Sequence, residues 1–99
     1  MSDKYILDGK TPVPIDDLLA WGRWLESANR HVKIDLIDKV RISTVFLGLD
    51  HNYSGGPPLI FETMIFGGEL DGYCERCSTW DEAEREHEKA KSLVIKKTH

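Results

Sequence analysis

The chain has 99 residues, the size of one compact domain, and we expect residues 1–99 to form a single domain around one core. Its hydrophobic fraction of 40%, with three Trp, three Tyr and three Phe, excludes an intrinsically disordered protein. The formal net charge of −4 argues against a nucleic-acid-binding protein, because such proteins gather Lys and Arg on one face.

The amino-terminal residues lack the apolar segment of a secretory signal, and no apolar run approaches the roughly 20 residues that cross a bilayer. We therefore expect a cytoplasmic protein with no membrane partner. In a reducing cytoplasm the two cysteines, Cys74 and Cys77, are expected as free thiols.

The first third of the chain predicts a short strand and then a helix. Residues 4–7 are strand-like, and Asp16 or Asp17 caps a helix that runs to about Asn29. Apolar residues recur on one face of this helix at spacings of three and four: Leu18, Trp21, Leu25, Ala28 and Val32. Residues 32–39 fit either an edge strand or an irregular connection.

The centre of the chain predicts three strands. Residues 40–47 and 59–66, both rich in β-branched and aromatic residues, are the two strongest candidates. Residues 50–58 between them are rich in turn formers and are expected as a loop. Residues 73–77 are the third candidate. These strands should pair in sequence order as an antiparallel meander, because consecutive strands usually lie side by side.

The last segment predicts the clearest helix. Thr79 and Glu82 form a capping-box pattern, with Ser78 as an alternative start. Residues at spacings of three and four share its apolar face: Trp80, Ala83, His87, Ala90 and Val94. Because His87 falls on that face, we interpret it as a hydrogen-bonded core histidine and not as a ligand.

The expected fold is α+β in the order β-α-β-β-β-α, with an antiparallel sheet of three to four strands and two helices packed on one face. Yet the strand at 59–66 is apolar on both sides. Ile60, Met64 and Phe66 lie on one side, and Leu59, Phe61 and Ile65 lie on the other. The sheet face without helices therefore needs a loop, a partner protein or a second copy of the chain to cover it.

The loop at residues 50–58 is the first candidate binding site. Asp50, His51, Asn52 and Tyr53 gather polar groups at a strand end, where loops often bind ligands. The alternative is a stiff structural connection, since the two prolines that follow restrict the unfolded chain.

Two side chains outside this loop are further candidates for ligand or partner binding. Glu62 lies mid-strand on the side of Met64, where it is either a desolvated carboxylate or a solubilising charge on an open sheet, and we favour the second. Trp24 lies off the centre of the apolar face of its helix, at the core margin or at an interface, where Trp is enriched.

Cys74 and Cys77 form a single CxxC pattern. A structural zinc ion needs four ligands, and no second Cys or His pair has a matching spacing, while a thioredoxin-like site needs a βαβ unit that is absent. We therefore assign no metal and no cofactor, and Cys74 and Cys77 remain unassigned metal candidates. No phosphate-binding loop, nucleophile elbow or His-Glu-x-x-His pattern occurs, so no catalytic residue is predicted.

Several stretches together resemble a family of small bacteriophage and prophage proteins to which no activity is assigned. They are residues 40–52, Gly55-Gly56-Pro57-Pro58, Phe61-Glu62-Thr63-Met64, Phe66-Gly67-Gly68, Ser78-Thr79-Trp80 and Glu82-Ala83. The resemblance spans most of the chain from the first helix onward. It implies a small accessory protein that acts in the host cytoplasm by binding host components, and it brings no functional residues with it.

The leading hypothesis is a non-enzymatic binding protein that contacts a protein partner, or a second copy of itself, through the exposed sheet face or the loop at 50–58. The alternative is a binder of a nucleotide-like small molecule, or a minor hydrolase, centred on Asp50, His51 and Glu62. The sequence identifies neither the partner nor the ligand, and it does not give the oligomeric state.

Overall fold

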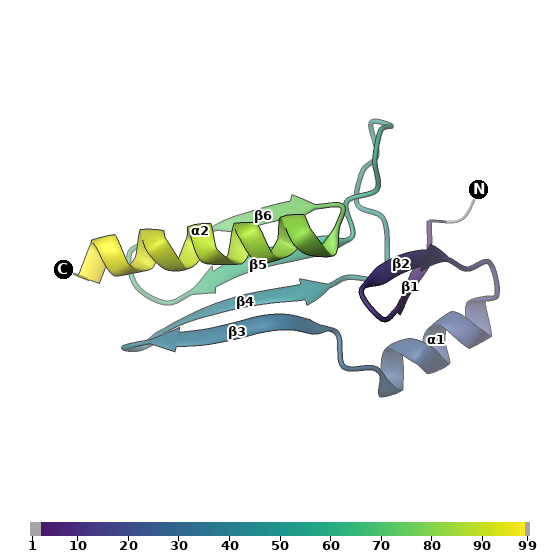
Figure 1. The fold of residues 1–99 in the computed structure, drawn as a ribbon, viewed down its shortest axis with the longest axis horizontal. Coiled ribbons are helices and arrows are strands. Elements are labelled where there is room, and N and C mark those ends of the chain that lie inside the picture. Colours follow the sequence, from purple (N-terminus) through teal and green to yellow (C-terminus); the bar gives the residue numbers. More distant parts are fainter. Residues whose placement is uncertain (1–2, 99) are drawn as a thin grey trace.

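The computed structural model describes residues 3–98 and confirms a mixed α+β fold (Figure 1). The elements in chain order are β1 (Tyr5–Asp8), β2 (Thr11–Pro14), α1 (Leu18–Ser27), β3 (His31–Ile37), β4 (Val40–Phe46), β5 (Phe61–Phe66), β6 (Cys74–Cys77) and α2 (Trp80–Thr98). Both expected helices and the three expected central strands are present. The structure adds β2 to the expected order and shows that the undecided segment at 32–39 is largely a strand, β3.

Strands β3 to β6 form a four-stranded antiparallel sheet in chain order, and β1 and β2 form a separate hairpin. In the sheet, Ile42 of β4 lies opposite Asp35 of β3 and Ile65 of β5. Because opposite residues point to the same face, this register determines which side chains meet on each side of the sheet. The expected meander is confirmed.

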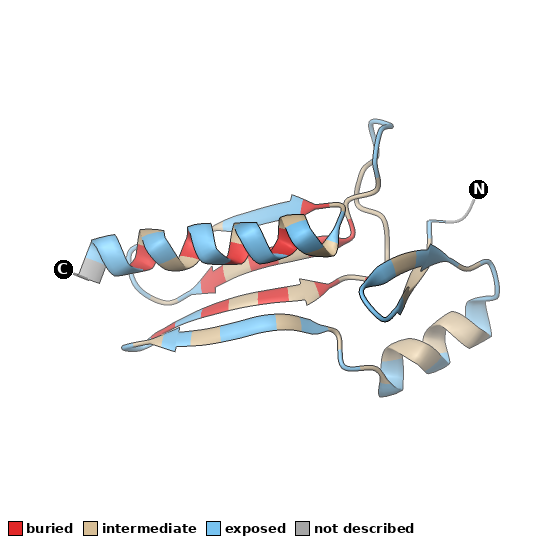
Figure 2. Cartoon of the chain, viewed as in Figure 1, coloured by how far each residue is buried: buried red, intermediate tan, exposed pale blue. Residues whose placement is uncertain are grey.

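Helix α2 lies along one face of this sheet and forms the core with it (Figure 2). The buried residues of the helix are Ala83, His87, Ala90 and Val94. Three of them belong to two apolar clusters of the core, and His87 belongs to neither. One contains Val40, Ile42, Ile65, Ala90 and Val94, and the other contains Phe46, Ile60, Phe61, Cys77 and Ala83. His87 lies between the two clusters in sequence and on the same face of the helix, so the core is not one continuous apolar cluster.

The start of α2 is set by a local hydrogen-bond exchange. The backbone N–H of Glu82 donates to Thr79 Oγ1 at 3.1 Å, and the backbone N–H of Thr79 donates to Glu82 Oε1 at 3.1 Å. This is the expected capping box, in which each side chain satisfies a donor that the first helical turn leaves unpaired. Neither described helix has the length and hydrophobicity of a membrane span.

Helix α1 lies beside the β1–β2 hairpin beyond the end of the sheet, so α2 is the main cover of the sheet face (Figure 1). Asp17 caps α1 by accepting from the Ala20 N–H at 3.1 Å. Only three residues separate the end of β2 from the start of α1, and this short connection keeps the helix next to the hairpin. It reaches the rest of the fold through Trp21, whose Nε1 donates to the Gly48 carbonyl at 2.9 Å.

Candidate functional site

The face of the four-stranded sheet opposite α2 carries no second helix in the described part of the chain. We call it the open face and define it from the strand register. Its residues are His31, Ile34 and Leu36 of β3; Arg41, Ser43 and Val45 of β4; Glu62, Met64 and Phe66 of β5; and Cys74 and Arg76 of β6.

The open face exposes large apolar side chains. Leu36 is 71% exposed, Ile34 48% and Phe66 37%, and Val45 and Met64 lie half-buried on the same face. Together with neighbouring polar residues, four of these side chains line a shallow hollow of about 230 Å³. Contiguous apolar surface of this kind on a small domain is typical of an interaction site.

The charged groups of the open face are arranged around this apolar surface. Arg76 Nε donates to Glu62 Oε2 at 2.9 Å, and the Arg41 guanidinium lies 4.5 Å from the centre of the Phe66 ring. Glu62 is thus paired with Arg76 on the open face, and its side chain is 15% exposed, so it is not a freely solvated surface charge. The open face carries two Arg and one Glu, so it has a positive balance on a chain whose formal charge is −4.

Cys74 and Cys77 are not brought together as a metal or redox pair. Cys74 is an exposed thiol on the open face, whereas Cys77 lies opposite Phe61 and is buried in the core. Partial burial, with Glu62 nearby, raises the pKa of Cys74, and burial raises the pKa of Cys77 to about 11. Neither thiol is a good nucleophile at neutral pH, because the reactive form is the thiolate.

The loop at 50–58 uses its polar groups to hold its own shape. Asp50 Oδ1 accepts from the backbone N–H groups of Asn52 at 2.8 Å and Leu59 at 2.9 Å. The Asn52 amide donates to the Pro57 carbonyl at 2.8 Å. The loop projects away from the sheet (Figure 1), with Tyr53 87% exposed and His51 half-buried. This geometry matches a structural connection that presents one aromatic side chain.

Trp24 is half-buried and packs against the core beneath α2, away from the open face. Its ring meets Phe46 edge-on at 5.7 Å between centroids, and Phe46 belongs to the core beneath α2. The contact anchors α1 to the end of the sheet. Of the candidates from sequence, the open face therefore contains Glu62 and Cys74, but neither Trp24 nor the hydrogen-bonded loop residues.

A chain of buried hydrogen bonds links β5, β4, α2 and β3 beneath the helix. Thr63 Oγ1 lies 2.6 Å from Thr44 Oγ1, which lies 2.7 Å from His87 Nδ1, and His87 Nε2 lies 2.8 Å from Asp35 Oδ2. The hydrogen bond from His87 lowers the pKa of Asp35, so the carboxylate is ionised and accepts from Nε2–H. The expected role of His87 as a hydrogen-bonded core histidine is confirmed.

This hydrogen-bonded chain has the hydroxyl–imidazole–carboxylate order of a catalytic triad, but no substrate can reach it. Thr44 and His87 are fully buried and Thr63 is 1% exposed. A nucleophile must contact its substrate, so burial excludes hydrolysis at these hydroxyls in the folded chain. The arrangement satisfies buried polar groups and sets the position of α2 on the sheet.

The side chains of Asp35, His87 and Glu88 also lie close enough to share a metal ion. Two lysines already pair with the carboxylates of this cluster. Lys33 Nζ is 2.9 Å from Glu88 Oε2, and Lys91 Nζ is 3.8 Å from Asp35 Oδ1. Both carboxylates have cationic partners, so the cluster matches a network of ion pairs.

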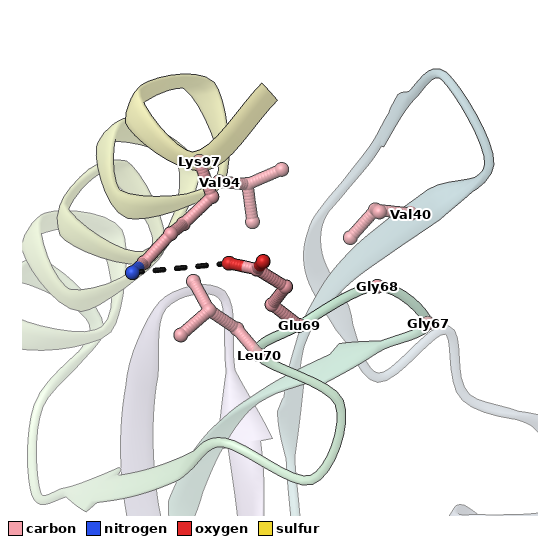
Figure 3. Close-up of a pocket in the computed structure, with 7 residues that line it drawn as sticks. All are labelled: Val40, Gly67, Gly68, Glu69, Leu70, Val94 and Lys97. Carbon is pink, nitrogen blue, oxygen red and sulfur yellow. Dashed lines mark ion pairs between the residues drawn. The ribbon is translucent and has the colours of Figure 1, made fainter. Parts of the chain in front are cut away.

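A second hollow, of about 190 Å³, lies between the turn after β5 and the last turns of α2 (Figure 3). Its lining is Val40, Gly67, Gly68, Glu69, Leu70, Val94 and Lys97. The charged groups at this hollow, Lys97 Nζ and Glu69 Oε2, lie 3.8 Å apart as an ion pair. The hollow offers apolar contact and no set of converging polar groups for a specific ligand.

The two-sided apolar pattern of residues 59–66 predicted an uncovered sheet face from sequence, but the assignment of Ile60 to the side of Met64 and Phe66 was wrong. Ile60 precedes β5 and is buried in the core with Phe61. Ile34 and Leu36 belong to the open face because β3 is a strand, and the alternation of apolar and charged residues in β3 was the signal for it in the sequence.

Comparison of the chain with protein-family models, with curated proteins and with solved structures finds no match.

Proposed function

We propose that the chain is a non-enzymatic binding protein that contacts a partner protein through its open face. The observation that supports this most is the one-sided cover of the sheet: α2 buries one face, and the other exposes Ile34, Leu36 and Phe66. Burying such side chains is worth about 25 cal/mol per Å² of apolar surface, which gives a partner a substantial gain.

The composition of the open face indicates the chemistry of the partner. Phe66, Met64 and Arg41 are of the residue types that are enriched at protein interfaces, and Arg41 lies against the Phe66 ring. The positive balance of the face favours an apolar patch on the partner that is bordered by acidic groups. The resemblance to phage and prophage proteins adds that the partner would be a host component.

Catalysis has little support in this geometry. The one histidine–hydroxyl arrangement described above is buried, and the thiol pKa values are raised. A small-molecule or hydrolase site in the loop at 50–58 has no support either, because Asp50 and Asn52 are engaged in the loop's own hydrogen bonds.

Site-specific photo-cross-linking tests the proposal. A benzophenone amino acid replaces Phe66 on the open face in one variant and Lys89, exposed on α2, in a matched control. In extract of the host cell, we expect the Phe66 variant to form a discrete adduct that the control does not form. Excess unlabelled wild-type chain should compete for the adduct, and excess Arg41→Glu chain, verified as folded by circular dichroism, should not.

Two results would contradict the proposal. One is the absence of any adduct from Phe66. The other is the same set of adducts from both positions, because that pattern reports nonspecific contact.

A further inference from the structure

The four-stranded sheet has two edge strands, β3 and β6, and they differ in how well they are protected. An edge strand presents unpaired backbone N–H and C=O groups, and proteins usually block it with a short length, Pro, or an irregularity. β3 has seven residues and no Pro or Gly, and its irregularity lies at one end, between His31 and Lys33. The regular part, residues 33–37, exposes Ile34 and Leu36. The remaining protection of this edge is the charge of Lys33 and Asp35, which disfavours pairing with a strand whose charges do not match.

We propose that β3 pairs antiparallel with β3 of a second copy of the chain. A two-fold axis perpendicular to the sheet lies between the two strands and keeps each face of the sheet continuous. Residues directly opposite each other share a face, so one central residue must lie opposite the same residue of the second copy. Centred on Ile34, the pairing places Lys33 of each copy opposite Asp35 of the other. Centred on Lys33 or on Asp35, it places like charges opposite each other. A centre on Leu36 sets Asp35 opposite Ile37 and brings no charges of the strand together. Opposite charges directly across a strand pair stabilise it, and like charges destabilise it, so we select Ile34, the centre that brings Lys33 and Asp35 together.

The other edge does not offer the same solution. β6 has four residues, and a two-fold axis through Glu75 or through Arg76 opposes two like charges. Pairing β3 of one copy with β6 of another joins two different edges and leaves one edge of each kind unpaired, which continues into an open chain of copies. Self-pairing of β3 is the arrangement that closes.

The dimer changes the open face as well as the edge. The two sheets join into one of eight strands, and Ile34 of both copies meets at the two-fold axis on the open face. Leu36 of each copy flanks this centre, so the two apolar surfaces become one. Pairing at the β3 edge does not depend on the proposed binding of a partner protein, because a monomer would leave the open face as it is.

Sedimentation equilibrium of the full chain over a concentration series tests the association. We expect a monomer–dimer equilibrium whose dissociation constant rises about tenfold in Lys33→Glu, because two symmetric charge pairs turn from attractive to repulsive. Glu88→Gln removes the partner that Lys33 has within its own chain, at 2.9 Å, and should not weaken the dimer. Lys89→Glu, the same change on an exposed face of α2, should leave the constant unchanged. A wild-type chain that stays monomeric at millimolar concentration overturns the inference, as does an equal effect of the two variants.

Disulfide cross-linking tests the register separately. Ile34→Cys and Leu36→Cys are each made in a chain in which the exposed Cys74 is replaced by Ser. Residues directly opposite on paired strands bring their Cβ atoms within roughly 5 Å, so Ile34→Cys should oxidise to a covalent dimer. In the Ile34-centred register the two Leu36 positions are four residues apart along the strands, beyond the reach of a disulfide. A covalent dimer from Leu36→Cys alone overturns the register.

Discussion

Removing the hydroxyl of Thr44 tests the buried hydrogen bonds between the sheet and α2. Thr44→Val keeps the branched shape but removes the oxygen that lies 2.6 Å from Thr63 Oγ1 and 2.7 Å from His87 Nδ1. Both partners are buried and lose this hydrogen bond. A buried polar group left unpaired costs roughly 1–3 kcal/mol, so the two together should lower the free energy of unfolding by about 2–6 kcal/mol. For a domain of this size that lowers Tm by at least about 8 °C.

Thr63→Val is the matched control, because it removes the hydroxyl at the end of the same hydrogen-bonded chain. Thr44 then keeps its bond to His87 and loses only the contact with Thr63, so we expect a cost of about 1 kcal/mol. Urea unfolding followed by Trp fluorescence and by circular dichroism gives both values. The reasoning is refuted if Thr63→Val costs as much as Thr44→Val, or if Thr44→Val is neutral.

Three further predictions concern other parts of the fold. The hydrogen bond from His87 lowers the pKa of Asp35 below its ordinary value of 3.8. The stability that the ionised Asp35 carboxylate contributes is therefore present above about pH 4 and is lost as the pH falls through the folded pKa. Asp35→Asn should flatten the acid side of the curve of Tm against pH, and an unchanged slope would count against this contribution. A thiol reagent should titrate one cysteine per folded chain, the exposed Cys74, and reach Cys77 only in denaturant; rapid reaction of both in the native protein contradicts its burial. Gly48→Ala should lower the free energy of unfolding by about 1–2 kcal/mol in a urea titration, because φ is +78° and a Cβ would lie 2.9 Å from a side-chain atom of α1; a neutral result would show that α1 shifts freely.

The parts of the fold that follow local rules were predictable from sequence. The capping box at Thr79 and Glu82 and the apolar face of α2 depend on residues three or four apart, so their signal lies within one segment. β3 was ambiguous because an edge strand is partly exposed on both faces and its pattern is weak. The position of α1 beside the hairpin was not predictable, because it depends on the pairing of β2 with β1. The two prolines of β2, Pro12 and Pro14, argue against a strand when the sequence is read alone.

The partners of His87 lay beyond local patterns. Thr44 and Asp35 are 43 and 52 residues away in sequence, and only the strand register places them beneath the helix. The helical spacing did show that His87 faces the core, but it could not name what satisfies the ring. The open face was predictable in outline from the two-sided apolar strand β5, whereas its charges depend on the pairing of β5 with β6.

The rate at which Cys74 reacts with a maleimide tests the binding role of the open face most directly, because this exposed thiol is a natural reporter on that face. The rate is measured by mass spectrometry for the purified chain and for the chain in host-cell extract, with a denatured sample to calibrate reagent consumption. If a partner covers the open face, Cys74 should react several-fold more slowly in extract, and Arg41→Glu should restore the rate of the purified chain. Equal rates in buffer and in extract, with the chain folded in both, would contradict the proposal that the open face binds a partner.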